Sequence, residues 1–169
     1  MRATLDRLYD AAAYLAAFFL IGTLVMVLTG ILGRLANWYV PGTDAYAGYC
    51  MAASGFLALA HTLKRGEHIR VSLAIEHLRP LARHRLELWA LAAAIVLAAS
   101  FAWYSVRLAI QSWQFNDIST ANDATPLWIP QLAMALGSVV LLIAFVDELM
   151  LEWRGKRAAA TPTEALHHE

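Results

Sequence analysis

Four long stretches without charged side chains dominate the pattern of this sequence. They cover residues 11–33, 45–63, 88–106 and 124–146, and they are 23, 19, 19 and 23 residues long. Ionisable groups are costly in hydrocarbon, and an α-helix of about 20 apolar residues crosses a layer roughly 30 Å thick. The pattern therefore predicts four membrane-spanning helices, which we place at about 11–33, 45–63, 86–110 and 126–147.

Composition supports an all-α integral membrane protein. Hydrophobic residues make up 60% of the chain and charged residues 15%, whereas roughly 25% of residues are charged in a typical soluble domain. The 13 basic and 13 acidic residues cancel, which argues against a nucleic-acid partner. The single cysteine excludes an internal disulfide. We expect residues 1–153 to form the transmembrane domain and the Ala-, Thr- and Pro-containing segment 154–169 to form a disordered cytoplasmic tail.

The distribution of Lys and Arg predicts how the chain is oriented. Eleven of these residues flank the first span on its N-terminal side, connect spans two and three, or follow the last span. The two remaining connections hold only Arg34 and Arg107. Basic residues are retained on the cytoplasmic side, so both termini and the middle connection should be cytoplasmic. The first stretch exceeds the apolar core of a signal peptide and should remain as an anchor.

The connection between spans two and three predicts an additional element. After Lys64 and Arg65, Ser72 is a suitable N-cap for a short segment that separates apolar from charged positions. We expect a short amphipathic interfacial helix within 64–80, attracted to anionic lipid; the alternative is a plain charged connector. Pro80 suits a first helical turn. A helix from there to about Gln114 would exceed the bilayer thickness and project into the cytoplasm.

The centres of the spans offer no group for chemistry. None carries a charge, and His61 is the only histidine within a span, so we predict no catalytic residue, metal or cofactor. Two other classes stay open: a membrane anchor of a redox enzyme, with haem at His61, and an autonomous four-span transporter. Small residues recur at three- and four-residue spacing in the spans. They favour either close packing within the bundle or a face for another membrane protein.

Three motifs resemble the small membrane subunit of tripartite ATP-independent periplasmic (TRAP) transporters, the DctQ-like family, over about residues 5–153. The most specific is the run from Lys64 to Val71, which reads KRGEHIRV. The second is the run Pro126–Ile129, reading PLWI, with Gly137 further along the same span. The third pairs Arg34 at the end of span one with Asp44 before span two. The chain departs from the family in carrying Ala and Tyr after Asp44 and in lacking a proline before Gly137.

The resemblance implies a non-catalytic subunit in a bacterial inner membrane. It would work with a large multi-span permease and a periplasmic solute-binding protein to import an organic acid, driven by an ion gradient. It implies that the inner motif lies along the lipid bilayer and braces the permease: Lys64, Arg65, Gly66, Glu67, His68, Ile69 and Arg70. It also implies that a second set faces the periplasmic partner: Arg34, Trp38, Asp44, Asp117, Asp123, Pro126 and Trp128.

Overall fold

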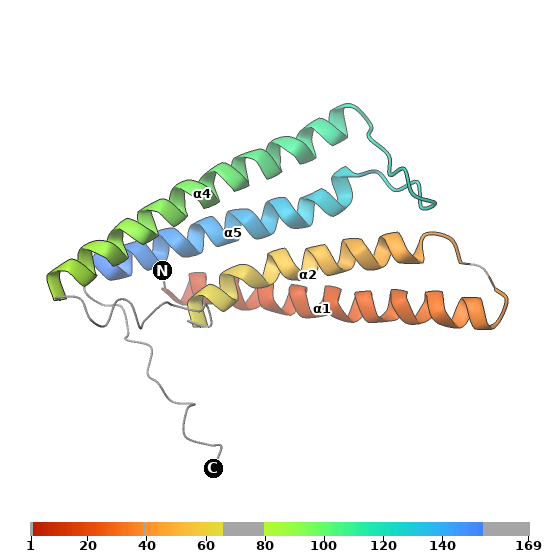
Figure 1. Cartoon of the computed structure of the whole chain (residues 1–169), viewed down its shortest axis with the longest axis horizontal. Helices are drawn as coiled ribbons and strands as arrows, with labels where there is room; N and C mark the ends of the chain where they lie inside the picture. The colour runs from red at the N-terminus through yellow and green to blue at the C-terminus, as the bar shows by residue number, and fades with distance from the viewer. Residues whose placement is uncertain (1, 39, 66–79, 154–169) are drawn as a thin grey trace, which may run out of the picture.

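The computed structural model describes residues 2–38, 40–65 and 80–153, and its regular elements there are four α-helices (Figure 1). They are α1 (Arg2–Leu35), α2 (Thr43–Arg65), α4 (Pro80–Gln114) and α5 (Trp128–Trp153). Residues 64, 65 and 80 belong to the ends of α2 and α4. The rest of the predicted interfacial helix, and the tail 154–169, lie outside the described residues.

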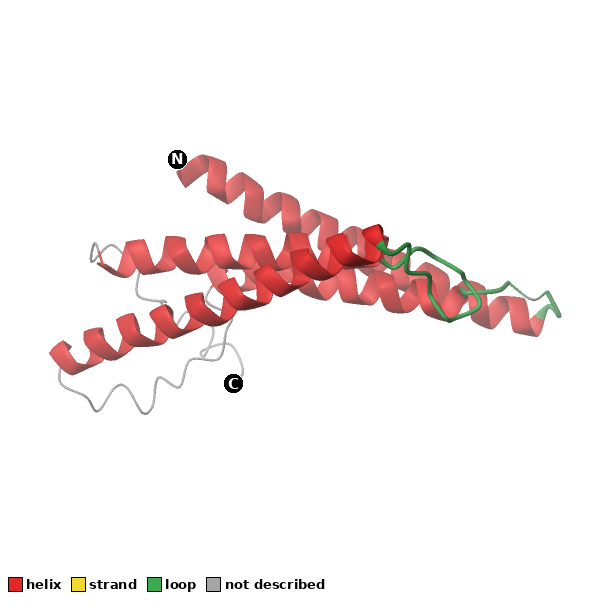
Figure 2. Ribbon diagram, turned by 90° about the horizontal axis from the view of Figure 1, so that it is seen from above, coloured by secondary structure: helices red, strands yellow, loops and turns green. Residues whose placement is uncertain are grey.

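The helices lie side by side in a row, in the order α1, α2, α5, α4 (Figures 1 and 2). Two antiparallel hairpins, α1–α2 and α4–α5, meet mainly through α2 and α5. We call the end that carries the connections 36–42 and 115–127 the loop end. The opposite end, where α1 and α4 begin and α2 and α5 finish, is the terminal end. Among the described residues, no further helix covers either broad face of this row.

The helices extend beyond the predicted spans at most of their ends. The expected helix from Pro80 to Gln114 is confirmed by α4, whose 35 residues correspond to about 52 Å. Span four was expected at about 126–147, and the helix of this region, α5, begins at Trp128. Pro126 precedes the helix: it forms an isolated bridge with Ile118, and its carbonyl oxygen accepts a hydrogen bond from the Ile129 N–H at 3.2 Å. Pro130 occupies the first turn of α5, where its missing N–H has no helical partner to lose.

Three of the described helices are long and apolar enough to cross a membrane, namely α1, α4 and α5. Helix α2 falls short because tyrosine, glycine, serine and histidine interrupt its apolar residues. It packs between α1 and α5, so neighbouring helices cover part of its surface. The chain is therefore an all-helical membrane protein, and the role of α2 as a fourth span remains a prediction.

Small residues bring the helices into close contact. A Cβ atom built on Gly137 of α5 would lie 2.5 Å from the carbonyl oxygen of Phe56 on α2, and one on Gly22 of α1 would lie 3.3 Å from Cys50 Sγ. Glycines 48 and 55 of α2 differ, because nothing stands within 4 Å of such an atom. Some of the small residues therefore pack between the helices, whereas Gly48 and Gly55 are exposed, and a face for another membrane protein stays a prediction.

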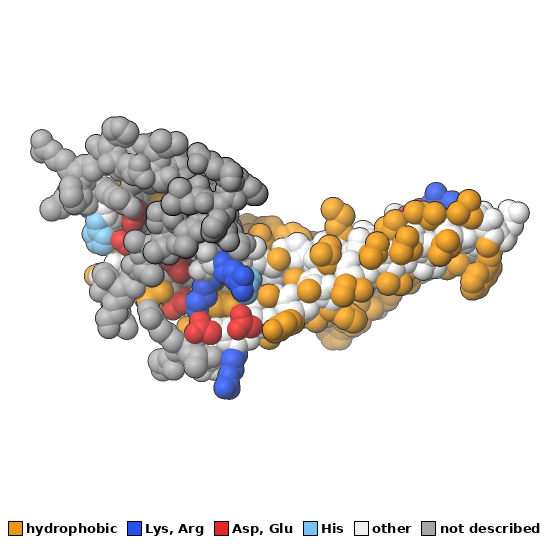
Figure 3. Space-filling model, turned by 90° about the horizontal axis from the view of Figure 1, so that it is seen from below, with side chains coloured by type: hydrophobic (Ala, Val, Ile, Leu, Met, Phe, Trp, Pro, Cys, Tyr) orange, Lys and Arg blue, Asp and Glu red, His pale blue; other side chains and the backbone are white. Residues whose placement is uncertain are grey.

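The outer surface of the row is strongly apolar along its length. Large hydrophobic side chains on α1 and α4 are exposed, among them Phe18 (66%), Leu24 (58%) and Leu97 (71%). Figure 3 shows hydrophobic side chains along the shaft, with charged side chains gathered towards its ends on that face. Contiguous apolar surface of this kind marks contact with lipid or with another protein.

Candidate functional site

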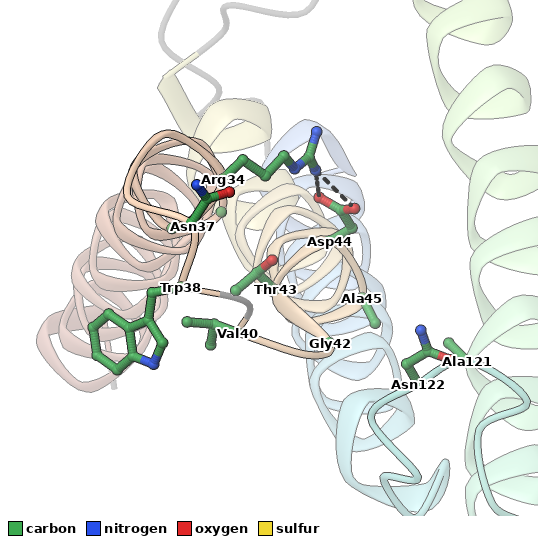
Figure 4. Close-up of a pocket in the computed structure, with 12 residues that line it drawn as sticks. Arg34, Asn37, Trp38, Val40, Gly42, Thr43, Asp44, Ala45, Ala121 and Asn122 are labelled. Carbon is green, nitrogen blue, oxygen red and sulfur yellow. Dashed lines mark hydrogen bonds and ion pairs between the residues drawn. The ribbon is translucent and has the colours of Figure 1, made fainter.

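The loop end brings together predicted docking residues from two connections. Arg34, in the last turn of α1, places its Nη2 atom 3.3 Å from Asp44 Oδ2 in the first turn of α2. Both side chains are exposed, at 71% and 86%. Figure 4 shows the two side chains meeting above the α1–α2 connection. An exposed pair of this kind contributes only about 0–1 kcal/mol to stability, which leaves both groups accessible to a partner.

A hollow of about 570 Å³ lies beside this ion pair. Its walls come from the end of α1, the 36–42 connection and the start of α2, with Ala121 and Asn122 contributed by the 115–127 connection (Figure 4). Trp38 also lines it, but its ring points away from the ion pair and is 72% exposed. The hollow thus joins the two connections at the loop end.

Two glycines allow the chain to fold tightly around the hollow. A Cβ atom on Gly33 would stand 2.6 Å from the carbonyl oxygen of Trp38. Gly42 has a φ of 79°, and a Cβ atom there would stand 2.9 Å from Asp123 Cβ. Glycine tolerates positive φ without steric cost. Gly42 therefore lets the start of α2 approach the 115–127 connection.

A cluster of side-chain hydrogen bonds connects the 115–127 connection to α2. We call its five residues the tyrosine clasp: Tyr46, Tyr49, Ser119, Asp123 and Thr125. Tyr49 Oη donates to Asp123 Oδ2 at 3.0 Å and lies 2.9 Å from Ser119 Oγ. Ser119 Oγ donates to Asp123 Oδ1 at 2.8 Å, and Thr125 Oγ1 donates to Tyr46 Oη at 3.1 Å. The clasp connects residues about 70 positions apart in sequence.

The clasp also determines the charge of Asp123. Desolvation by surrounding atoms raises its pKa, but hydrogen bonds from Thr125, Ser119 and Tyr49 lower it by more. The net effect holds the pKa of the Asp123 carboxyl below its ordinary value. Because hydrogen bonds to the ionised form stabilise it, Asp123 is a carboxylate that holds the loop in place. Its oxygens point into the clasp.

The remaining predicted docking residues divide between the loop and the helix row. Asp117 is exposed, and its backbone carbonyl oxygen accepts a hydrogen bond from the Leu127 N–H at 2.9 Å. This bond holds the two ends of the 115–127 connection together beside the Pro126 bridge. Trp128 is half-buried and lines an apolar groove between α4 and α5. The structure thus gathers Arg34, Trp38 and Asp44 at one hollow, while Asp123 and Trp128 are engaged within the chain.

At the terminal end, the structure describes two residues of the inner motif. Lys64 forms an ion pair with Asp6 of α1, and its Nζ lies 4.6 Å from the centre of the Tyr9 ring. Arg65 is exposed. The motif residues Gly66, Glu67, His68, Ile69 and Arg70 lie outside the described part of the chain. Lys64 therefore fastens the end of α2 to α1.

Several contacts of both ends could not be expected from the sequence pattern. His61 Nδ1 lies 3.7 Å from Asp10 Oδ1, so a carboxylate faces the one histidine within a span. His84 Nδ1 lies 2.9 Å from Glu152 Oε1, linking α4 to α5. Tyr49 and Ser119 were missed because neither belongs to a motif. The available signal was the pair Tyr46 and Tyr49, which are three residues apart and therefore lie on one face of the helix.

A row of long apolar helices with polar ends is typical of a helical membrane protein. Comparison with known families identifies its family. Residues 23–155 match the family model described as tripartite ATP-independent periplasmic transporters, DctQ component. The match covers more than half of the chain, which therefore belongs to the DctQ family of TRAP transporter components. None of the curated proteins compared with the chain matches it.

Proposed function

We propose that this chain is the small, non-catalytic membrane subunit of a TRAP transporter that imports an organic acid by means of an ion gradient. Its partners are a large multi-span permease and a periplasmic solute-binding protein. It lies in the bacterial inner membrane with four spans and with both termini in the cytoplasm. Membership of the DctQ family supports the shared assembly. The solute, the ion and the geometry of the assembly are the proposed part.

The observation that carries the proposal is the uncovered face of α2. This helix is less apolar than the other three, yet Gly48, Ala52 and Gly55 are exposed along it. These residues are spaced by four and three, which places them on one side of a helix. Exposed small residues let another helix approach closely. We infer that a helix of the large permease packs along this face.

Co-purification tests this proposal. The tagged chain is co-produced with the large permease of its transporter, and Gly55→Leu is compared with the wild type. We expect Gly55→Leu to keep the thermal stability of the chain and to lose both the permease and solute uptake. Ala17→Leu, at an exposed position of α1, is the matched control and should keep both. Full uptake without any co-purifying polytopic protein would contradict the proposal.

The loop end is the proposed contact for the solute-binding protein. Arg34, Asp44 and Trp38 are exposed around one hollow and offer both signs of charge beside an aromatic ring. Aromatic and arginine side chains are enriched at protein interfaces. Asp117 and Pro126 are exposed on the neighbouring loop, which adds to this surface. We assign Asp123 to positioning the loop and Trp128 to anchoring α5 at the interface.

Exchanging the charges of Arg34 and Asp44 distinguishes a role of this ion pair in docking from a role in the fold. Arg34→Glu should weaken uptake, and we expect the loss to diminish at high concentrations of the solute-binding protein. The double variant Arg34→Glu/Asp44→Arg restores the ion pair with its direction reversed. If the pair matters only for the fold, this double variant recovers uptake. If it contacts the binding protein, as we propose, uptake stays low.

Lys64 and Arg65 complete the proposal at the terminal end. Lys64 is bound to α1, whereas Arg65 is exposed, so Arg65 is available to lipid headgroups or to the permease. We assign the motif from Lys64 to Arg70 to bracing the permease at the membrane surface. Arg65→Gln should reduce recovery of the permease while leaving the thermal stability of the isolated chain unchanged.

A further inference from the structure

A polar strip lies on α4 near the loop end. Arg107, Gln111 and Gln114 are spaced by four and three residues, so they share one side of the helix. Arg107 and Gln114 are exposed, and Gln111 is half-buried. With Trp103, Val106 and Ile110 they line a hollow of about 300 Å³. The strip interrupts an otherwise apolar surface.

Arg107 is the charged member of this strip. Across residues 2–38, 40–65 and 80–153, no carboxylate forms an ion pair with it. By contrast, Arg34 at the same end is paired with Asp44. A cation on a lipid-exposed helix is costly unless an anion or the headgroup layer satisfies it. Since the described residues offer Arg107 no carboxylate, an anion of the surrounding lipid can supply the missing partner.

The depth of Arg107 indicates which anion is within reach. Trp89 and Trp113 are both exposed on α4, and their separation corresponds to about 36 Å along the helix. That distance suits two aromatic belts at the bilayer interfaces. Arg107 lies about 9 Å below Trp113. A long arginine side chain can extend from a span end towards the headgroup layer, and Gln111 and Gln114 follow one and two turns further along the helix.

An apolar groove runs beside the strip and shares Val106 and Ile110 with it. The groove has a volume of about 410 Å³ and lies between α4 and α5. Its upper walls are Trp113 and Trp128, and its lower wall includes Val139. It therefore leads from the interface towards the membrane centre. An acyl chain in this groove would leave its headgroup beside Arg107.

We propose that the strip binds the phosphodiester of an anionic phospholipid in the leaflet at the loop end, with one acyl chain in the α4–α5 groove. Arg107 supplies the charge, since a guanidinium binds phosphate oxygens with two N–H groups at once. The side-chain amides of Gln111 and Gln114 donate further hydrogen bonds to the headgroup. This site lies on α4 and does not depend on the proposed permease contact on α2.

Photolabelling tests the site. The full chain is placed in bilayers containing phosphatidylglycerol with a photoreactive group on one acyl chain, and labelled peptides are identified by mass spectrometry. We expect labelling to concentrate on residues 106–113 and 128–139. Arg107→Gln should lower it about tenfold, the effect of losing one strong charged interaction, and Arg107→Lys should lower it less. Arg85→Gln, at another exposed position of α4, is the control and should leave it unchanged.

A second variant tests the groove separately from the charge. Leu136 is 57% exposed and lines the groove, so Leu136→Trp should displace the label while the thermal unfolding midpoint stays the same. Equal labelling of α1 and α4 in every variant would overturn the proposal, as would equal labelling by a diacylglycerol probe without phosphate. Efficient crosslinking of Arg107→Cys to the permease in the assembled complex would show a protein partner there instead, and would also overturn it.

Discussion

Gly137 of α5 lies directly against the backbone of α2 at Phe56. A Cβ atom on Gly137 would stand 2.5 Å from the Phe56 carbonyl oxygen and 2.6 Å from its carbonyl carbon. Backbone atoms cannot move aside as a flexible side chain can, so only glycine permits this approach. Because α2 and α5 form the main contact between the two hairpins, this position controls how closely the hairpins meet.

Replacing Gly137 by alanine should therefore destabilise the chain. We expect a loss of about 1–3 kcal/mol in the free energy of unfolding, the usual cost of inserting a methyl group into close packing. Unfolding in detergent, followed by circular dichroism, measures it. Gly55→Ala is the matched control, because its new methyl group meets nothing within 4 Å. Equal losses in the two variants would disprove the close α2–α5 approach.

Two Tyr→Phe substitutions should have opposite effects. Tyr9 is 1% exposed, and its hydroxyl has no hydrogen-bond partner among the described residues; removing a buried, unsatisfied hydroxyl should leave stability unchanged or raise it by up to about 1 kcal/mol. Tyr49→Phe removes the hydrogen bond to Asp123 and should cost about 0.5–1.5 kcal/mol. Chemical unfolding of both variants gives the comparison. Destabilisation by Tyr9→Phe would show that its hydroxyl is bound after all.

Acid should loosen the tyrosine clasp. The pKa of Asp123 is lowered in the folded protein, so its contribution to stability is complete above the unfolded-state pKa of about 4 and is lost as the pH falls through the folded-state pKa. The difference in thermal midpoint between wild type and Asp123→Asn should be largest near pH 7 and should shrink below about pH 4. A difference that persists to pH 2 would refute this account.

The exposed ion pair of the loop end should contribute little to stability. Arg34→Ala is expected to change the free energy of unfolding by less than about 1 kcal/mol, because solvent screens Arg34 and Asp44. A double-mutant cycle with Asp44→Ala measures the coupling. A coupling well above that value would mean that the pair is structural, and would remove the argument that it is kept available for a partner.

The helices could be predicted from the sequence because ionisable side chains are costly in the hydrocarbon layer, so spans appear as long stretches without charge. The limits of α4 followed from Pro80 at one side and a polar loop at the other, and the structure has the same limits. The start of α5 did not follow, because Pro126 and Pro130 are both compatible with a first turn. Only the bridge between Pro126 and Ile118 decides between them.

The site was predicted in part. Arg34 and Asp44 stand on either side of a short connection, so their pairing is nearly local. The tyrosine clasp joins Tyr49 to Asp123 across two helices, and no periodic pattern encodes such a pairing. Arg107 was expected near the outer end of span three, and α4 continues beyond it to Gln114, as the helix expected from Pro80 implies.

The single-layer arrangement of the helices has a mechanical consequence. The two hairpins meet along α2 and α5, at a buried cluster of the terminal end in which Tyr9 of α1 packs with Ala144 of α5, and at the loop end through the tyrosine clasp. A force on the 115–127 connection reaches α2 directly through the clasp. Opening the clasp would loosen the loop end while the terminal end stays packed, so the residues that shape the loop-end surface also determine its stiffness.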